Sequence, residues 1–301
     1  MISVEVRYIT SCIPGRWAEY SPILENEITI DEYMAGIEMV PPPALHPSHN
    51  INTNPLPPKI NEAGRMSNAK RNEGQLLTDI IGLESLVDEI TYTLASEADD
   101  APTATAILGP FWRKDAPRLP MRATIVQTAL PDADHTLMHG RVLDSTTGAP
   151  LAGAELDVWH TAPNGLYESQ DPTQPDMNLR GRFTTGADGE YAFYCLRPTS
   201  YPVPNDGPAG KLLQLLDRHP MRPAHIHFIV SAPGYKPLVT QVFDRRDEHI
   251  ENDSVFAVKD SLIVDFVPLS GDPQALFELE YTFKLARYET KGVAGATAVA
   301  P

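Results

Sequence analysis

After Pro110 the chain is a succession of short runs rich in valine, isoleucine, threonine and aromatic residues, separated by glycine- and proline-containing turns. Runs of this kind are typical of β-strands. Their spacing leaves little room for a helix between one strand and the next, so it favours an antiparallel β-sandwich over strand–helix–strand units. The predicted strands are Ala123–Ala129, Thr136–Asp144, Ala154–His160, Gly181–Thr184, Glu190–Leu196, His225–Ala232, Leu238–Phe243 and Leu276–Ala286.

One amphipathic helix is predicted between Glu73 and Ser96, ahead of the strands. Its apolar residues recur at steps of four and three, which places them on a single helical face. The face consists of Leu76, Ile80, Leu83, Val87, Ile90 and Leu94. Because the pattern is short, packing against the same chain is favoured over a coiled coil. A second helix is predicted from Pro208 to Arg218.

The fold class predicted is therefore mainly β, an antiparallel β-sandwich with an N-terminal helical segment. Residues 1–60 receive no assignment, and the prolines between Pro41 and Pro58 disfavour helix or central strand there, which suggests a linker or wrapping arm. The helical segment is placed at 61–106 and the sandwich at 107–289. Residues 290–301, rich in alanine and glycine, are expected to be a flexible tail.

The charge and the cysteines narrow the function further. A formal net charge of −16 over 301 residues argues against nucleic acid and against an anionic membrane surface, since both carry phosphate. Only Cys12 and Cys195 are present, too few and too far apart for a disulfide framework. The N-terminus carries no secretory signal pattern, so a cytoplasmic protein is predicted.

His225 and His227 open an apolar strand, and they flank Ile226. Side chains alternate across a strand, so both imidazoles point to one face while Ile226 points to the other. Alone the pattern is a weak signal for a metal site, because a polar strand face explains it more often.

Two tyrosines lie in loops, where functional side chains are often carried. Tyr167 ends the turn that begins at Pro163, and Tyr201 lies between prolines in the segment Pro198–Pro204. The following proline biases Tyr201 toward an extended backbone, which limits the directions in which its ring can point. Taken singly, each tyrosine is better explained as an edge residue that forms a hydrogen bond through its hydroxyl.

Two imidazoles and two phenols together suit iron(III) better than zinc. Zinc sites draw on Cys, His, Asp and Glu, whereas a phenolate is stabilised by a trivalent cation beside it. Arg222, three residues before His225, adds a permanent positive charge that suits an anionic substrate. A surface salt bridge is the alternative explanation for Arg222.

The ordered motifs resemble those of the intradiol ring-cleavage dioxygenases, in the branch of the catechol and hydroxyquinol 1,2-dioxygenases. The resemblance covers roughly Gly64 to Ala286. The matching motifs are Ile107–Phe111, Asp157–His160 followed by Gly165–Tyr167, Pro198–Pro204, and Arg222–Phe228. Residues 1–60 do not match the family's first helices.

The resemblance implies one non-haem iron(III) per chain, held by Tyr167, Tyr201, His225 and His227. It implies that Tyr201 is the ligand that leaves the metal and accepts a proton from the substrate. Arg222 matches an arginine that stabilises charge on the ring, and Gln241 matches a polar residue beside the site. The N-terminal helical segment resembles a dimer contact, which makes a homodimer one option.

The implied reaction opens an aromatic diol or triol with O₂, and the chain is most similar to the hydroxyquinol type. Asp79 would accept a hydrogen bond from the third hydroxyl of benzene-1,2,4-triol, which catechol lacks. The predicted substrate-binding residues are Leu76, Asp79, Ile107, Leu108, Gly109, Pro110, Val203, Pro204, Arg222 and Val255. Three alternatives stay open: a catechol 1,2-dioxygenase, a sandwich that binds without catalysis, and a histidine-based zinc hydrolase.

Overall fold

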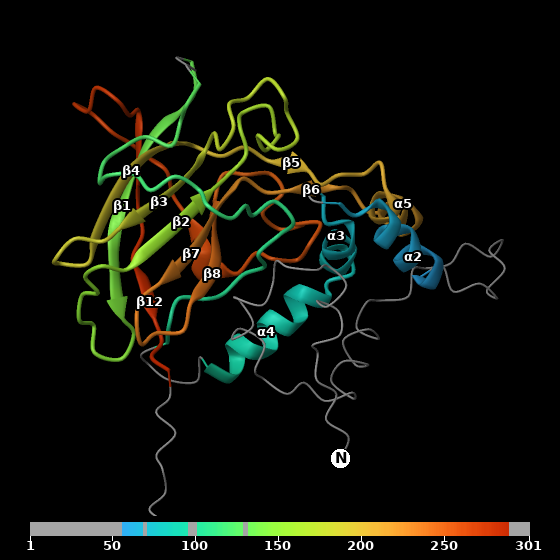
Figure 1. The fold of residues 1–301 in the computed structure, drawn as a ribbon, viewed down its shortest axis with the longest axis horizontal. Helices are drawn as coiled ribbons and strands as arrows, with labels where there is room; N and C mark the ends of the chain where they lie inside the picture. The colour runs from blue at the N-terminus through green and yellow to red at the C-terminus, as the bar shows by residue number, and fades with distance from the viewer. Residues whose placement is uncertain (1–55, 69–70, 96–100, 129–131, 289–301) are drawn as a thin grey trace, which may run out of the picture.

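The computed structural model describes residues 56–68, 71–95, 101–128 and 132–288, shown as the coloured ribbon in Figure 1. The predicted arm before residue 56 and the predicted tail from residue 290 lie outside these ranges. Within the described ranges, no helix is long and apolar enough to cross a membrane.

The first sheet is built around the long strand β1 (His135–Asp144). One edge of β1 pairs antiparallel with β4 (Glu190–Leu196). The other edge pairs parallel with two short strands in turn, β11 (Phe277–Glu280) and β12 (Phe283–Leu285). Strand β10 (Val267–Pro268) pairs with β11 at the margin.

The predicted last strand is thus divided in two, and Gly140 on β1 explains the division. The backbone of Tyr281 approaches so closely that a Cβ on Gly140 would meet the Tyr281 carbonyl at 1.9 Å. That carbonyl accepts a hydrogen bond from the Tyr191 hydroxyl at 2.7 Å instead of joining the ladder. The strand pattern is therefore interrupted where the chain bends toward β1.

The second sheet carries the strands that lead to the candidate site, in the order β3-β2-β7-β8-β9. A separate two-stranded ladder, β5-β6, lies beyond it. The bounds are β2 Glu155–Trp159, β3 Arg180–Thr184, β5 Tyr201–Pro202, β6 Met221–Arg222, β7 His225–Ser231, β8 Leu238–Asp244 and β9 Ile263–Val264, with a 3₁₀ turn, η3, at Asp260–Leu262.

The mainly β sandwich with N-terminal helices is confirmed, but its sheets are mixed. The pairs β2-β3 and β7-β8 are antiparallel, as predicted, whereas β1-β11, β1-β12 and β8-β9 are parallel. Parallel partners need a long crossover. More than a hundred residues separate β1 from β11. Turn spacing gives information only on strands that follow one another in the sequence, so it could not predict the pairing of β1 with β11 and β12.

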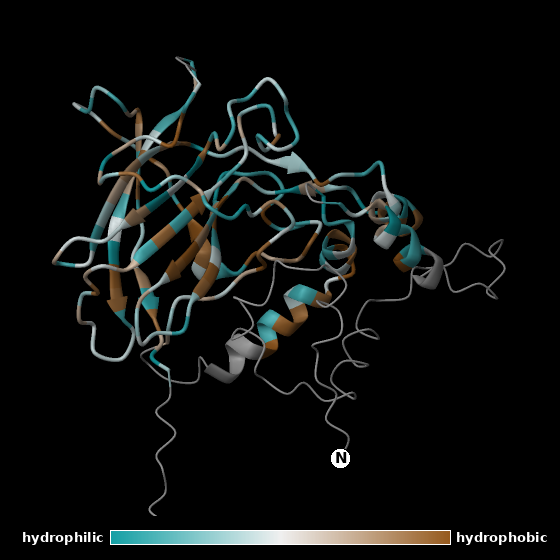
Figure 2. Cartoon of the chain, in the orientation of Figure 1, coloured by the Kyte–Doolittle hydropathy of each residue, from teal (hydrophilic) through white to brown (hydrophobic). Residues whose placement is uncertain are grey.

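The two sheets enclose one hydrophobic core, to which both contribute alternate side chains. On β7 the inward residues are Ile226, Phe228 and Val230, all fully buried. Figure 2 shows the corresponding hydrophobic colour along the strands. His225 and His227 therefore lie on the outer face of the second sheet, where helices and loops cover them.

Four described helices lie at one side of the sandwich (Figure 1). They are α2 (Leu56–Met66), α3 (Glu73–Ile80), α4 (Leu83–Ala95) and α5 (Pro208–Leu215). Buried residues of α3 and α5, among them Leu76, Ile80 and Leu213, pack with Phe243 of β8 and with Val255. This packing joins the helical segment to the outer face of the second sheet.

Three local predictions need correction. Helix α2 begins at Leu56, inside the proline-rich stretch, because prolines are tolerated in a first helical turn, where amides have no partner. The helix predicted over Glu73–Ser96 breaks at Gly82, whose φ is +76°. Its Ile80 carbonyl instead accepts a hydrogen bond from Arg218 at 2.7 Å.

The third correction concerns the segment predicted as the strand Ala123–Ala129. Its described residues form only a single bridge, between Thr124 and Tyr194. The amide of Ile125 still donates to the Tyr194 carbonyl, while the Ile125 carbonyl accepts from Leu179, directly before β3 of the other sheet. The segment crosses from one sheet to the other, so no ladder continues along it.

Candidate metal centre

Four buried side chains converge on one point at the outer face of the second sheet. His225 and His227 project from β7, Tyr201 is the first residue of β5, and Tyr167 lies in the loop after β2. The two Nε2 atoms are 3.0 Å apart, and the two phenol oxygens are 3.2 Å apart. The structure thus brings together all four residues predicted as metal ligands.

Hydrogen bonding fixes the tautomer of His225. Its Nδ1 lies 2.6 Å from the carbonyl oxygen of Pro223, which can only accept, so Nδ1 carries the proton. Nε2 then presents a lone pair to the centre. Burial lowers the pKa of both His225 and His227 well below the ordinary value, so both imidazoles are neutral. Neutral imidazole is the form that binds a metal.

The two phenols are held in their neutral form in the absence of a metal. Burial raises the pKa of Tyr167 well above its ordinary value, and the neighbouring Tyr201 adds to the rise. Burial also raises the pKa of Tyr201, but the guanidinium of Arg222 opposes that rise. Either phenol therefore needs a nearby cation in order to ionise.

Aromatic packing holds the donors in place. Trp159 stacks on His227 with ring centroids 4.7 Å apart, and it is the register partner of His227 on β2. Phe111 stacks on Tyr167 at 4.4 Å. The guanidinium of Arg180 lies 5.8 Å from the centre of the Tyr167 ring and is paired with Glu168 at 2.8 Å.

The donor set fits a trivalent metal ion. Among the residues that the structure describes, no group of three or more His, Cys, Asp or Glu side chains could hold a metal. The other two donors at this point are phenols. The described part of the chain offers no hydrogen-bond partner to Nδ1 of His227. Two nitrogen lone pairs and two ionisable oxygens around one point suit iron(III).

Arg222 and Gln241 lie directly beside the donors. NH1 of Arg222 is 3.1 Å from Nε2 of His225. NH2 of Arg222 donates to the side-chain oxygen of Gln241 at 2.7 Å, and Gln241 donates to the Ile107 carbonyl at 2.6 Å. Gln241 is also the register partner of His227 on β8. The side chains of Arg222 and Gln241 are thus buried and joined by a hydrogen bond.

The predicted wall residues come from four separate segments. Leu76, Ile107, Val203 and Val255 are buried in one cluster. Gly109 lies against His227, since a Cβ on it would be 3.4 Å from Cε1. Leu108 is half-buried and packs with the aromatic residues of the site. Pro110 and Pro204 are half-buried, directly after Gly109 and Val203.

Asp79 is buried on α3, and its Oδ1 has no hydrogen-bond partner in the described structure. Burial, reinforced by the neighbouring carboxyl of Glu84, raises the pKa of Asp79 well above the ordinary value. Glu84 in turn accepts a hydrogen bond from the Leu108 amide at 3.0 Å. Glu84 lies on α4 and was not predicted. Its contact with Leu108, 24 positions away, cannot be seen in the sequence.

Asp253 is a second residue that sequence reasoning missed. It is buried, and its carboxylate accepts hydrogen bonds from Nε and NH2 of Arg222 at 3.1 and 3.2 Å. Asp253 lies two residues before Val255, a predicted wall residue. A carboxylate close to that wall residue was the available signal.

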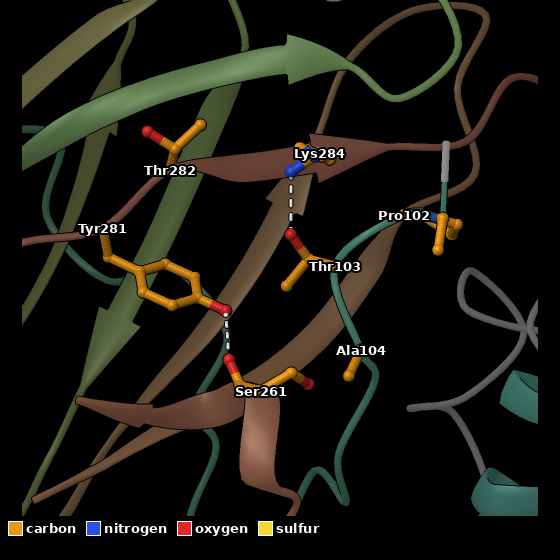
Figure 3. Close-up of a pocket in the computed structure, with 8 residues that line it drawn as sticks. Pro102, Thr103, Ala104, Ser261, Tyr281, Thr282 and Lys284 are labelled. Atoms are coloured by element: carbon orange, nitrogen blue, oxygen red, sulfur yellow. Dashed lines mark hydrogen bonds between the residues drawn. The ribbon is translucent and has the colours of Figure 1, made fainter. Parts of the chain in front are cut away.

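A shallow hollow of about 280 Å³ lies apart from these residues (Figure 3). Its lining includes Thr103, Ser261, Tyr281 and Lys284, and none of the residues predicted for metal or substrate. Within it the Thr103 hydroxyl accepts a hydrogen bond from the Lys284 amide at 2.8 Å, and the Tyr281 hydroxyl donates to the Ser261 carbonyl at 3.3 Å.

Two family models match the chain. The model described as catechol dioxygenase N terminus matches residues 60–99, and the model described as dioxygenase matches residues 107–287. Together they cover the helical segment and the sandwich.

Characterised relatives are similar over most of the chain. An intradiol ring-cleavage dioxygenase of Aspergillus niger is 44% identical over 87% of this chain and 77% of its own. A catechol 1,2-dioxygenase of Candida albicans is 43% identical, over 87% and 80%. A hydroxyquinol 1,2-dioxygenase of a Rhizobium species is 46% identical, over 76% and 78%.

The crystal structure of hydroxyquinol 1,2-dioxygenase from Pseudomonas putida superposes with a TM-score of 0.68. The match has 36% sequence identity and covers 77% of this chain and 82% of that one.

Proposed function

The chain belongs to the intradiol ring-cleavage dioxygenases, and from this premise we propose that it acts on hydroxyquinol with iron(III) as its metal. Hydroxyquinol, benzene-1,2,4-triol, would be cleaved between its two vicinal hydroxyls. Both atoms of O₂ enter the product, 3-hydroxy-cis,cis-muconate, whose keto form is maleylacetate. The proposed ligands are Tyr167, Tyr201, His225 and His227.

One observation supports the metal assignment above the others: four buried donors from three separate segments face a common point. The closest pairs are the two imidazole nitrogens at 3.0 Å and the two phenol oxygens at 3.2 Å. Burying such polar atoms costs free energy unless a partner satisfies them. A metal ion would satisfy all four at once.

Iron(III), when bound, supplies the Lewis acidity that ionises the diol and draws charge from its ring. Tyr201 is proposed as the base that takes one proton from the substrate, because burial raises the pKa of its phenol and so favours the protonated form. Arg222 is proposed to stabilise negative charge on the bound ring through NH1, the nitrogen nearest the donors. Burial of all these groups keeps water away from the reacting ring.

The proposal for the substrate rests on Asp79. A buried carboxyl with an unpartnered Oδ1 is costly unless a ligand satisfies it. Burial raises the pKa of Asp79 and so favours the protonated carboxyl, which has one oxygen that accepts and one hydroxyl that donates. The free acceptor suits the third hydroxyl of hydroxyquinol. Leu76, Ile107, Val203 and Val255 are proposed as the apolar wall.

Catechol is the second candidate substrate. The relative from Candida albicans, named a catechol 1,2-dioxygenase, is nearly as similar as the hydroxyquinol enzyme from Rhizobium. Catechol would enter the same wall and give cis,cis-muconate, but it would leave Oδ1 of Asp79 unsatisfied.

The deciding experiment compares hydroxyquinol, catechol and protocatechuate by oxygen uptake, with the ring-opened products identified by mass. We expect kcat/KM to be highest for hydroxyquinol. Iron content and the visible absorption of tyrosinate bound to iron(III) are measured on the same protein. A higher kcat/KM for catechol would overturn the substrate, and colourless protein after iron reconstitution would overturn the metal assignment.

A further inference from the structure

The carboxylate of Asp253 forms two hydrogen bonds with one edge of the Arg222 guanidinium. Nε of Arg222 donates to Oδ1 at 3.1 Å and NH2 donates to Oδ2 at 3.2 Å. Two parallel bonds fix both the position and the plane of a guanidinium. NH2 also donates to Gln241 at 2.7 Å, which leaves NH1 to face His225.

The same carboxylate shapes the turn that follows it. The amide of Val255 donates to Oδ1, and the amide of Ala257 donates to Oδ2, both at 3.2 Å. Val255 and Ala257 are buried against α3. The carbonyl of Val255 is held separately, by the Ser85 hydroxyl at 2.6 Å. The carboxylate of Asp253 therefore accepts four hydrogen bonds, two from the arginine and two from the turn.

The turn between these two amides is strained, which indicates that its shape is imposed. Phe256 has a φ of +58°, a conformation that costs free energy in a residue with a side chain. Its ring is about half exposed and covers the guanidinium of Arg218 at 4.3 Å. The Asp253 bonds on either side hold Phe256 in this conformation.

We propose that Asp253 is a positioning residue for ring cleavage, which holds NH1 of Arg222 toward the substrate and sets Val255 against it. The inference rests on the proposed function, because it assigns Arg222 a role in that reaction. Asp253 acts through its neighbours and touches neither metal donor nor, by this assignment, substrate.

The variant Asp253→Asn tests the role. The amide nitrogen replaces either Oδ1, which faces Nε of Arg222 and the Val255 amide, or Oδ2, which faces NH2 of Arg222 and the Ala257 amide, so two of the four bonds are lost. We expect kcat on hydroxyquinol to fall by about 10- to 100-fold, the usual effect of removing a supporting partner. Asp253→Glu keeps the charge and should recover part of this loss.

Asp144 provides a matched control. It is also buried, and it also accepts from two backbone amides, Thr146 and Thr147, and from one arginine, Arg287. It lies at the end of β1, in the other sheet. Asp144→Asn should lose comparable stability in thermal unfolding yet keep kcat within about twofold of the unmodified protein.

Ser85→Ala separates the two tasks of Asp253, since it loosens the Val255 carbonyl and leaves the arginine held. Here we expect a raised KM with little change in kcat, whereas Asp253→Asn lowers kcat. Equal kcat values in folded, iron-loaded Asp253→Asn and the unmodified protein would overturn the proposal. Should Asp253→Asn not fold, the comparison is made with Asp253→Glu, whose kcat must then lie below that of Asp144→Asn.

A measurement on metal-free protein tells this proposal apart from the proposed function. In protein labelled with ¹⁵N at arginine, the Nε–H signal of Arg222, identified by its loss in Arg222→Lys, should be protected from solvent exchange. Protection should persist in Asp144→Asn and disappear in Asp253→Asn. Inactive wild-type protein with this pattern would refute the proposed function alone, and unchanged protection in Asp253→Asn would refute the role of Asp253.

Discussion

Tyr201 and Arg222 are register partners in the two-stranded ladder β5-β6. The proposed base and the proposed cation are therefore placed side by side by backbone hydrogen bonds, independently of any metal. Burial raises the pKa of Tyr201, and Arg222 opposes that rise. A ladder of only two residue pairs thus places beside Tyr201 the cation that opposes this rise in its pKa.

The variant Tyr201→Phe should bind iron but turn over poorly. It retains the aromatic contacts of Tyr201 and three of the four proposed ligands. Loss of a base costs about 10²- to 10⁴-fold in rate. Iron is measured by elemental analysis and kcat by oxygen uptake. Turnover at the unmodified rate would show that another group takes the proton.

His225→Ala and Tyr167→Phe should lose iron altogether, because each removes a proposed permanent ligand. Loss of a residue that supports a ligand lowers metal affinity about 10- to 100-fold. We expect the loss of a ligand to lower iron affinity further. Tyr191→Phe is a suitable control, since Tyr191 is equally buried and donates only to the Tyr281 carbonyl. Normal iron binding by His225→Ala would refute the ligand assignment.

Substrate preference should depend on the hydrogen-bonding capacity of Asp79 and not on its charge. Asp79→Asn keeps an acceptor for the third hydroxyl, so the ratio of kcat/KM for hydroxyquinol to that for catechol should change little. Asp79→Leu removes the acceptor, and the ratio should fall about 10- to 100-fold. If Asp79→Leu retained the original ratio, a residue other than Asp79 would bind the third hydroxyl.

Much of this site could be predicted from the sequence because strand alternation is a local property. It placed His225 and His227 on one face, and the structure puts Ile226 in the core on the other. The partners of Arg222 and Leu108 could not be predicted in the same way. Asp253 lies 31 positions from Arg222, and Glu84 lies 24 positions from Leu108. Such contacts depend on how segments pack.

The same distinction applies to the fold. The turn residues correctly indicated most strands, since a turn is specified by a few adjacent residues. The break between α3 and α4 was missed, because the apolar period continues across Gly82. At the end of α3 the Ile80 carbonyl accepts a hydrogen bond from Arg218, which belongs to a segment far along the chain.

Gly109→Ala should impair the site through His227. The residue has a φ of +72°, so any side chain is strained, by about 1–2 kcal/mol. The added Cβ would also lie in van der Waals contact with His227, 3.4 Å from Cε1 and 3.9 Å from Nε2. Gly148→Ala is matched in φ, at +68°, but its Cβ meets open space. Both variants should lose similar stability, while only Gly109→Ala loses kcat/KM, by up to about 100-fold.

Stability should depend on pH through Asp157. Burial raises the pKa of Asp157 to about 6, although Trp112 donates a hydrogen bond to it at 3.1 Å. The folded protein therefore holds this proton more tightly than the unfolded chain, whose pKa is near 3.8. Its contribution is fully present below about pH 4, decreases as the pH rises, and is lost above about pH 6.

Asp157→Asn removes this dependence because an amide does not ionise. We expect the variant to be more stable than the unmodified protein at about pH 8, by about 1–3 kcal/mol in the free energy of unfolding. At about pH 4 the two should unfold at the same urea concentration. An equal difference at both pH values would show that Asp157 ionises normally in the folded protein.

The parallel pairing of β1 with β11 and β12 has a consequence for how the protein is made. Every proposed metal ligand leaves the ribosome well before Phe277, yet one edge of β1 stays open until residues 277–285 arrive. An unpaired edge next to an exposed apolar layer invites association between nascent chains. A premature stop codon a few residues before Phe277 would therefore yield insoluble polypeptide, even though the complete ligand set had been translated.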